Sequence, residues 1–210
     1  MDRKLLAWGL RGPPTPLPRL WLFTDDQRLP DPRASVAQLP RGRAGVVLRH
    51  DRDPARSTLG HDLARICRMR RLTLVVAGDV RLAARLRAGT HLRGGRWPAS
   101  PRPPGLVTSS AHSIPDLRRA RAAGASLIFL SPAFPTATHP GAPSLGPLRW
   151  AAMARAATAR TASISIAALG GVDGRTLPRL PAHLFHAVGA IAALISGEPQ
   201  LAGARASKYP

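Results

Sequence analysis

The sequence predicts a single-domain α/β protein with the (β/α)8, or TIM, barrel fold. Short apolar segments alternate with amphipathic helical segments along the chain, and the apolar segments number eight. They are continuously apolar, as expected for parallel strands that are covered on both faces. An open doubly wound sheet fits part of this pattern, but no GxGxxG turn follows the first apolar segment. The closed barrel is therefore the favoured fold.

Each predicted element rests on a local signal. The strands are expected at 20–24, 45–49, 72–76, 90–92, 106–110, 126–130, 163–167 and 184–188. The helices are expected at 53–70, 80–86, 114–123, 147–159, 175–180 and 189–195, the last opened by Gly189. The segment 94–104 is too rich in proline for a helix, so the fourth helix is expected to be degenerate. We assign 1–18 to an N-terminal extension, 19–197 to the barrel and 198–210 to a C-terminal tail.

The net charge of +20 raises the question of nucleic-acid binding. Of the 31 basic residues only Lys4 and Lys208 are lysines, a skew typical of a GC-rich coding sequence. The arginines are scattered, and no aromatic residues interleave with them to form a base-stacking platform. We therefore expect no specific nucleic-acid partner.

Cysteine usage and the first residues bear on the cellular compartment. Cys67 is the only cysteine, which excludes an intrachain disulfide, and its helical context predicts a buried, inert thiol. No segment reaches the ~18 consecutive apolar residues of a membrane helix. The apolar run at 5–10 is too short for a secretory signal, so a cytoplasmic location is expected. The sequence does not specify the oligomeric state.

The carboxyl ends of the predicted strands indicate where the chemistry lies, because a TIM barrel carries its active site there. Gly170 and Gly171 follow the seventh strand, and Gly189 and Ala190 follow the eighth. Glycine at these points permits close backbone approach, and free N–H groups at a helix start bind phosphate. The pattern therefore predicts a phosphate site. The alternative for each glycine is an ordinary tight turn.

Several motifs, in unbroken order from about residue 20 to 194, resemble those of thiamine-phosphate synthases. The segment SPAFPTATH at 131–139, followed by Leu145-Gly146, is similar to the family's GPIFPTxTK…LG loop. The segments at 168–172 and 187–191 are similar to its AIGGI and VVSAI motifs. Those at 107–113 and 20–25 resemble VSTHT and YLVTD. The resemblance is strong in the second half of the chain and thin in the first.

The resemblance implies an enzyme, a transferase of thiamine biosynthesis that joins a hydroxymethylpyrimidine pyrophosphate to a thiazole phosphate, with Mg²⁺ as cofactor. By position, Arg49 and Ser110 match residues at the pyrophosphate. The substrate and phosphate contacts match Thr136, Thr138, His139, Gly170, Gly171, Gly189 and Ala190. Small-molecule phosphates are the implied partners.

The departures from the family pattern concern the metal. The family's metal-binding aspartate after the third strand falls on Gly78, and a second falls within 94–97, where no acid occurs. Asp79 is the remaining candidate ligand. The family's lysine after the loop is His139 here. Loss of these ligands would deprive the leaving pyrophosphate of charge compensation, which Arg49 and Arg93 would supply in part.

Three functions therefore stay open. The first is a diverged thiamine-phosphate synthase. The second is a thiazole-phosphate tautomerase-like enzyme, although Pro132 stands where that branch has its catalytic histidine; His91 and His112 are other histidines at strand ends. The third is a non-catalytic protein that binds a phosphate ligand on the same barrel. All three retain a phosphate site.

Overall fold

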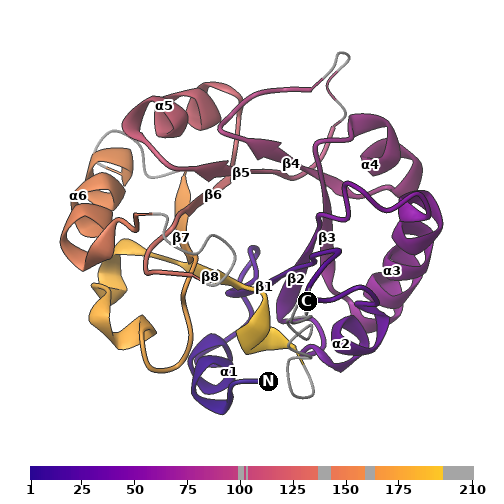
Figure 1. Cartoon of the computed structure of the whole chain (residues 1–210), viewed down its shortest axis with the longest axis horizontal. Coiled ribbons are helices and arrows are strands. Elements are labelled where there is room, and N and C mark those ends of the chain that lie inside the picture. The colour runs from indigo at the N-terminus through magenta and orange to yellow at the C-terminus, as the bar shows by residue number, and fades with distance from the viewer. Residues whose placement is uncertain (99–101, 103, 137–142, 159–163, 196–210) are drawn as a thin grey trace, which may run out of the picture.

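Eight parallel strands form a closed barrel, as predicted. The computed structural model describes residues 1–98, 102, 104–136, 143–158 and 164–195. The strands follow one another around the barrel in chain order, and β8 pairs with β1 to close it (Figure 1). They are β1 (Leu20–Phe23), β2 (Ala44–Leu48), β3 (Thr73–Ala77), β4 (Gly89–Arg93), β5 (Val107–Ala111), β6 (Leu127–Leu130), β7 (Ser165–Leu169) and β8 (Ala187–Ala190).

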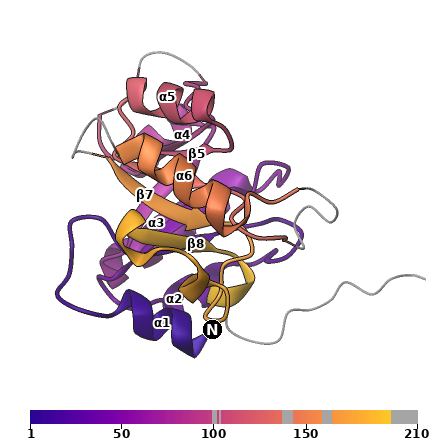
Figure 2. The ribbon, with the colours of Figure 1, turned by 90° about the vertical axis from the view of Figure 1, so that its left-hand side faces the viewer.

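Helices cover the outside of the barrel. The connecting α-helices are α2 (Arg33–Gln38), α3 (Arg56–Arg70), α4 (Val80–Leu86), α5 (Ile114–Ala122) and α6 (Gly146–Thr158). Figure 2 shows α6 on the outer side of β7. Within the described part of 94–106 no helix forms between β4 and β5, which confirms the predicted loss of the fourth helix. Pro98 and Pro104 lie in that connection and lack the N–H that a helix needs.

The barrel interior is filled by aromatic and branched side chains. Trp21 and Phe23 point inward from β1 and pack edge-on against Phe129 of β6, with ring centroids 5.6 and 4.8 Å apart. Leu20 and Leu22, on alternate positions of β1, belong to the separate outer core between sheet and helices. Strands buried on both faces explain why the sequence pattern is continuously apolar.

The last third departs from the predicted elements. The helix expected at 175–180 is a single 3₁₀ turn, η1 (Leu177–Arg179), because Pro178 and Pro181 prevent a longer helix. A second turn, η2 (Ala182–Leu184), occupies the predicted start of the eighth strand. Gly189 does not open a final helix. It lies inside β8, paired with Trp21 and Leu169, and the helix after it is only η3 (Ala192–Leu194).

A helix also forms within the predicted N-terminal extension. This helix, α1 (Arg3–Gly9), packs on the barrel through Leu5, which is fully buried, and through Trp8, whose ring lies 5.5 Å from that of Phe185. The backbone N–H of Asp2 donates to Ala193 in η3 at 2.8 Å. The helix thus covers a part of the barrel where the connections around β8 are only 3₁₀ turns.

Candidate functional site

A cavity of about 1000 Å³ opens at the carboxyl ends of the strands. Residues of β1, β4, β5, β7 and β8 line it, together with residues from the segments that follow β1, β2 and β4 to β8. One side carries arginines and the opposite side carries the glycine-rich ends of β7 and β8. These two parts are called the arginine side (Arg28, Arg49 and Arg93) and the glycine side (Gly170, Gly171 and 189–193).

Strand alternation directs two arginines to the arginine side. Val47 and His91 point into the barrel interior, and Arg49 and Arg93 stand two residues further along their strands. Because side chains alternate between the faces of a strand, each arginine continues the inward-facing row beyond the barrel end. Both arginines therefore reach the cavity from its floor.

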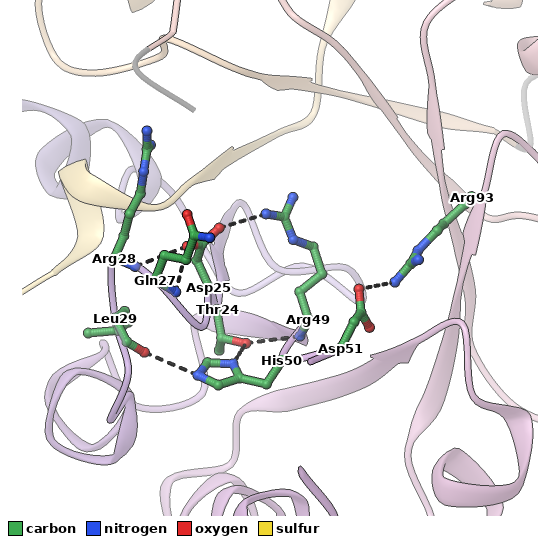
Figure 3. A network of polar contacts seen from close by, with 9 residues as sticks. All are labelled: Thr24, Asp25, Gln27, Arg28, Leu29, Arg49, His50, Asp51 and Arg93. Carbon is green, nitrogen blue, oxygen red and sulfur yellow. Dashed lines mark hydrogen bonds and ion pairs between the residues drawn. The ribbon is translucent and has the colours of Figure 1, made fainter. Parts of the chain in front are cut away.

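Carboxylates hold these arginines in place (Figure 3). Arg49 Nη2 donates to Asp25 Oδ2 at 2.9 Å, and Arg93 forms an ion pair with Asp51. Asp51 also pairs with Arg56 at 3.3 Å. The other carboxylate oxygen of Asp25, Oδ1, accepts the backbone N–H of Arg28 at 3.0 Å, which shapes the turn after β1.

A second network beneath the arginines fixes the ends of β1 and β2. The backbone N–H of Arg49 donates to the buried hydroxyl of Thr24 at 2.9 Å, and that hydroxyl lies 2.9 Å from Nδ1 of His50. His50 Nε2 reaches the carbonyl of Leu29 at 3.2 Å. Figure 3 shows this chain running below the guanidinium of Arg49. These hydrogen bonds join the segments that follow β1 and β2, and they fix the position of Arg49.

His91 forms part of the cavity floor as a neutral imidazole. Its ring packs against both Phe23 and Phe129, and its Nδ1 lies 2.9 Å from the hydroxyl of Thr108. Burial, reinforced by the charges of Arg49 and Arg93, lowers the pKa of His91 to about 3. The ring is therefore uncharged at neutral pH, and Nε2 is the ring nitrogen that Thr108 leaves for a ligand.

His112 and Ser131 form a polar group between β5 and β6. His112 Nδ1 donates to the carbonyl of Ser131 at 2.9 Å, which leaves Nε2 as an acceptor when the ring is neutral. The N–H of His112 donates to Asp116 at 3.0 Å. Burial alone would raise the pKa of Asp116, but the hydrogen bonds from His112 and Ser113 and the charge of Arg119 hold it below the ordinary value.

The glycine side is shaped by backbone conformation. Gly170 and Gly171 have φ of +88° and +63°, in the left-handed region that favours glycine. A Cβ on Gly171 would lie 2.4 Å from the carbonyl oxygen of Pro135, so the loop after β6 packs directly on this turn. The N–H of Phe134 donates to the carbonyl of Gly170 at 3.0 Å. Close packing against the loop after β6 is thus one reason why both positions are occupied by glycine.

The turn after β7 and the short helix η3 both present backbone N–H groups at the cavity. Among the backbone hydrogen bonds of the described residues, none has the N–H of Gly171, Val172, Ala192 or Ala193 as its donor, and all four residues line the cavity. Gly189 contributes space, because a Cβ there would lie 2.7 Å from the ring of Phe23. Unpaired N–H groups at a cavity wall are suited to an anion.

Most of the sequence-predicted site residues meet in this one cavity. Its lining includes Arg49, Ser110, Thr136, Gly170, Gly171, Gly189 and Ala190. Thr138 and His139 lie outside the described residues. The lining also contains residues that the sequence did not single out as site residues, among them Asp2, Arg28, Asp116 and Arg179. Arg28 follows the end of a strand, which is a local indication of a site residue, whereas no local sequence feature indicates Asp2.

The fold and the cavity define a (β/α)8-barrel protein with its site at the carboxyl ends of the strands, where proteins of this fold carry their active sites. The sequence profile of the family described as thiamine monophosphate synthase matches residues 21–194. The chain therefore belongs to the thiamine monophosphate synthase family.

Solved structures show the same fold. Thiamine phosphate pyrophosphorylase from Pyrococcus furiosus is 20% identical, with a TM-score of 0.67 over 86% of this chain and 89% of that one. The thiamine phosphate pyrophosphorylase from Bacteroides thetaiotaomicron is also 20% identical, with a TM-score of 0.54 over 84% of each chain. An aldolase/citrate lyase family protein from Burkholderia cenocepacia reaches 0.55 at 14% identity, over 83% of this chain and 88% of that one. At these levels of sequence identity, the similarity shows a shared fold.

Magnesium is the cofactor that the family implies, and the acids on the arginine side do not suit it. Asp25 is paired with Arg49, and Asp51 lies between Arg56 and Arg93. The carboxylate of Asp79, the candidate ligand from the sequence, accepts the N–H of Leu82 at 2.8 Å and caps α4; Asp79 is not part of the cavity lining. Among the residues that the structure describes, no three histidine, cysteine, aspartate or glutamate side chains gather as a metal site.

The environment of Gly78, which matches the family's metal-binding aspartate, is also cationic. A Cβ on Gly78 would lie 3.4 Å from Nη2 of Arg93. A side chain at 78 would thus be in contact with a guanidinium. This donor set does not fit a Mg²⁺ ion.

No helix among the described residues is long and apolar enough to cross a membrane.

Proposed function

We propose that this protein is a diverged thiamine-phosphate synthase that joins a hydroxymethylpyrimidine pyrophosphate to thiazole phosphate. One observation carries the proposal: a single cavity of about 1000 Å³ contains both a cationic side and a side of backbone donors. The reaction needs two anionic substrates held face to face, and this arrangement offers one anion site to each. Membership of the family supplies the substrate class.

The arginine side is the proposed pyrophosphate end. Arg49 offers a planar fork of N–H donors that suits phosphate oxygens, and Asp25 keeps that fork in place. Ser110, which lines the cavity at the end of β5, is placed to add a hydroxyl contact. Both residues carry the role that the family resemblance implied for them.

The glycine side is the proposed thiazole-phosphate end. The N–H groups of Gly171, Val172, Ala192 and Ala193 would donate to the phosphate oxygens, and Gly189 leaves room beside Phe23. Thr136 also lines the cavity, and the family resemblance assigns it, together with Thr138 and His139, to the substrate contacts.

The reaction requires charge compensation rather than proton transfer. The bond between the pyrimidine methylene carbon and the pyrophosphate oxygen breaks, and its electron pair leaves with pyrophosphate. The lone pair of the thiazole nitrogen then forms the new C–N bond. Arg49 stabilises the negative charge that develops on the leaving group, and the cavity excludes water from the methylene cation.

A tautomerase-like reaction is the second candidate, and one observation favours it. His112 donates its Nδ1 hydrogen to Ser131, so its Nε2 is available as a base beside the cavity. His112 therefore offers a base from β5 in place of the histidine that Pro132 replaces. The third candidate, a binding protein without turnover, predicts the same phosphate affinity and no product.

Product formation tests the proposal. The full chain is incubated with both substrates, with Mg²⁺ in one series and with EDTA in the other, and thiamine phosphate is measured by chromatography. Product in either series supports the synthase, and Arg49→Gln should lower the rate at least about tenfold. The matched control is Arg118→Gln, an exposed arginine on α5 away from the cavity. No product from a folded protein that binds thiazole phosphate would overturn it.

A further inference from the structure

Arg93, at the end of β4, lies beside Gly78, which follows the neighbouring strand β3. A Cβ on Gly78 would be 3.4 Å from Nη2, 3.5 Å from Cζ and 3.7 Å from Nε of this arginine. The guanidinium therefore lies within van der Waals distance of the position that a Cβ of residue 78 would take. The carbonyl of His91 accepts the N–H of Gly78 at 3.2 Å, which couples the end of β3 to the strand that carries Arg93.

Arg93 and Arg49 face one cavity, and each is supported by a carboxylate of the neighbouring loop. Figure 3 shows the guanidinium of Arg49 paired with Asp25 and that of Arg93 paired with Asp51. Arg49 and Arg93 line the same cavity as the buried ring of His91. These two positive charges of the cavity thus come from the ends of β2 and β4.

These ion pairs leave donors for a ligand. A guanidinium has five N–H donors, and a single carboxylate contact uses only some of them. The side chains of Arg93 and Asp51 are 55% and 36% exposed, so their ion pair is weak and open to exchange. The supporting acids orient the two cations without consuming their capacity to bind an anion.

We propose that Arg49 and Arg93 form a diphosphate subsite that works without a divalent metal ion, with the guanidinium of Arg93 in the place of the cation. This inference rests on the proposed function, because it specifies how the pyrophosphate end of the substrate is held. Two guanidinium forks bind adjacent phosphate groups in a bidentate manner and supply the charge compensation. The same two charges repel a Mg²⁺ ion.

Inorganic pyrophosphate is the probe for the first test. Its binding to the full chain is measured by isothermal titration calorimetry, once in EDTA and once in excess Mg²⁺. We expect binding in EDTA and affinity about tenfold weaker in Mg²⁺, because the metal neutralises the ligand and adds charge that the arginines repel. Absence of binding in EDTA, or tighter binding with Mg²⁺, would overturn the inference.

Substitution of Arg93 provides the second test. Arg93→Gln should weaken pyrophosphate binding in EDTA by about tenfold or more, whereas Arg93→Lys, which keeps the charge, should lose less. Arg118→Gln on α5 serves as the matched control and should bind as the wild type does. Urea unfolding shows that each variant is folded. Equal affinity of Arg93→Gln and Arg118→Gln would refute the role of Arg93.

The outcomes separate this inference from the proposed function. Formation of thiamine phosphate only with Mg²⁺ would overturn the metal-free subsite and leave the synthase in place. Metal-free binding of pyrophosphate with no thiamine phosphate formed would sustain the subsite and overturn the synthase.

Discussion

The Nδ1 of His91 lies 2.9 Å from the hydroxyl of Thr108, and the two residues are partners in the register of β4 and β5. This contact, with the packing of the ring against Phe23 and Phe129, holds a neutral imidazole in the floor of the cavity. The pKa of this imidazole is about 3, against an ordinary value of 6.5.

Stability should therefore depend on pH through His91. Between pH 6.5 and 3 the unfolded chain binds a proton at this residue and the native protein does not. The contribution is fully present above pH 6.5 and is lost as the pH falls, at most at about 1.4 kcal/mol per pH unit. The measurement is urea unfolding at about pH 7.5, about 6.0 and about 5.0. The free energy of unfolding of His91→Gln should fall less steeply with decreasing pH than that of the wild type. His61→Gln, at an exposed position of α3, should keep the wild-type slope; equal slopes for both variants would contradict the prediction.

Gly171 should tolerate no side chain. Gly171→Ala places a methyl group 2.4 Å from the carbonyl oxygen of Pro135 at a φ of +63°, and should lower the free energy of unfolding by about 2–4 kcal/mol. Gly42 is the matched control, because its φ is +66° and no atom lies within 4 Å of the position that a Cβ would take there. Gly42→Ala should cost only the left-handed conformation, about 1 kcal/mol. Similar losses in urea unfolding would show that packing on the loop after β6 is unimportant.

Asp79 should matter for α4 and not for a metal. Its carboxylate caps the helix through Leu82, so Asp79→Ala should lower the free energy of unfolding by about 1 kcal/mol, and Asp79→Ser should retain most of it. Neither substitution should change the response of the melting temperature to Mg²⁺. A metal-dependent stabilisation that disappears in Asp79→Ala would restore this residue as a ligand.

Cys67 should be unreactive in the native protein. It is buried in α3, and burial raises the pKa of its thiol to about 12. The thiolate is the reactive form of a cysteine. A thiol-specific disulfide reagent at about pH 8 should therefore react with the unfolded chain at least about a hundredfold faster than with the native protein. The sequence has one cysteine, so the readout belongs to this residue alone. Rapid native labelling would show that α3 opens readily.

Arg49 should be needed for binding rather than for folding. Its ion pair with Asp25 joins side chains that are 30% and 11% exposed, and Arg49→Gln should change the free energy of unfolding by less than about 1 kcal/mol. The same variant should weaken the affinity for pyrophosphate about ten- to a hundredfold, because charge-assisted hydrogen bonds are lost. Calorimetric titration beside urea unfolding measures both. A large stability loss with unchanged affinity would assign Arg49 a structural role.

Much of this architecture could be predicted from the amino-acid sequence. Short apolar segments alternate with helical segments, so all eight strands and their order were recognisable, as was the connection after β4 that lacks a helix. The glycine pair at 170–171 and Arg49 follow strands directly. Because all carboxyl ends of a parallel barrel meet at one end, their gathering in one cavity followed from the fold.

Element boundaries near the end of the chain could not be predicted in the same way. The local sequence predicts that Gly189 begins a helix, but pairing with β1 and β7 keeps it in a strand. The close side chains of Phe23, Leu169 and Phe129 explain why it lacks a side chain. Helix α1 likewise owes its place to burial of Leu5 against distant parts of the chain.

The sequence by itself determined the barrel, the family pattern and the loss of the acids at Gly78 and within 94–97. Only the tertiary structure decided what replaces them. The guanidinium of Arg93 lies beside Gly78 because β3 and β4 are neighbours in the sheet, although α4 separates the two residues in the chain. The carboxylate of Asp79 is turned to its own helix by a local cap. Periodicity and composition report burial, whereas the atom that fills a given space depends on which strands lie side by side.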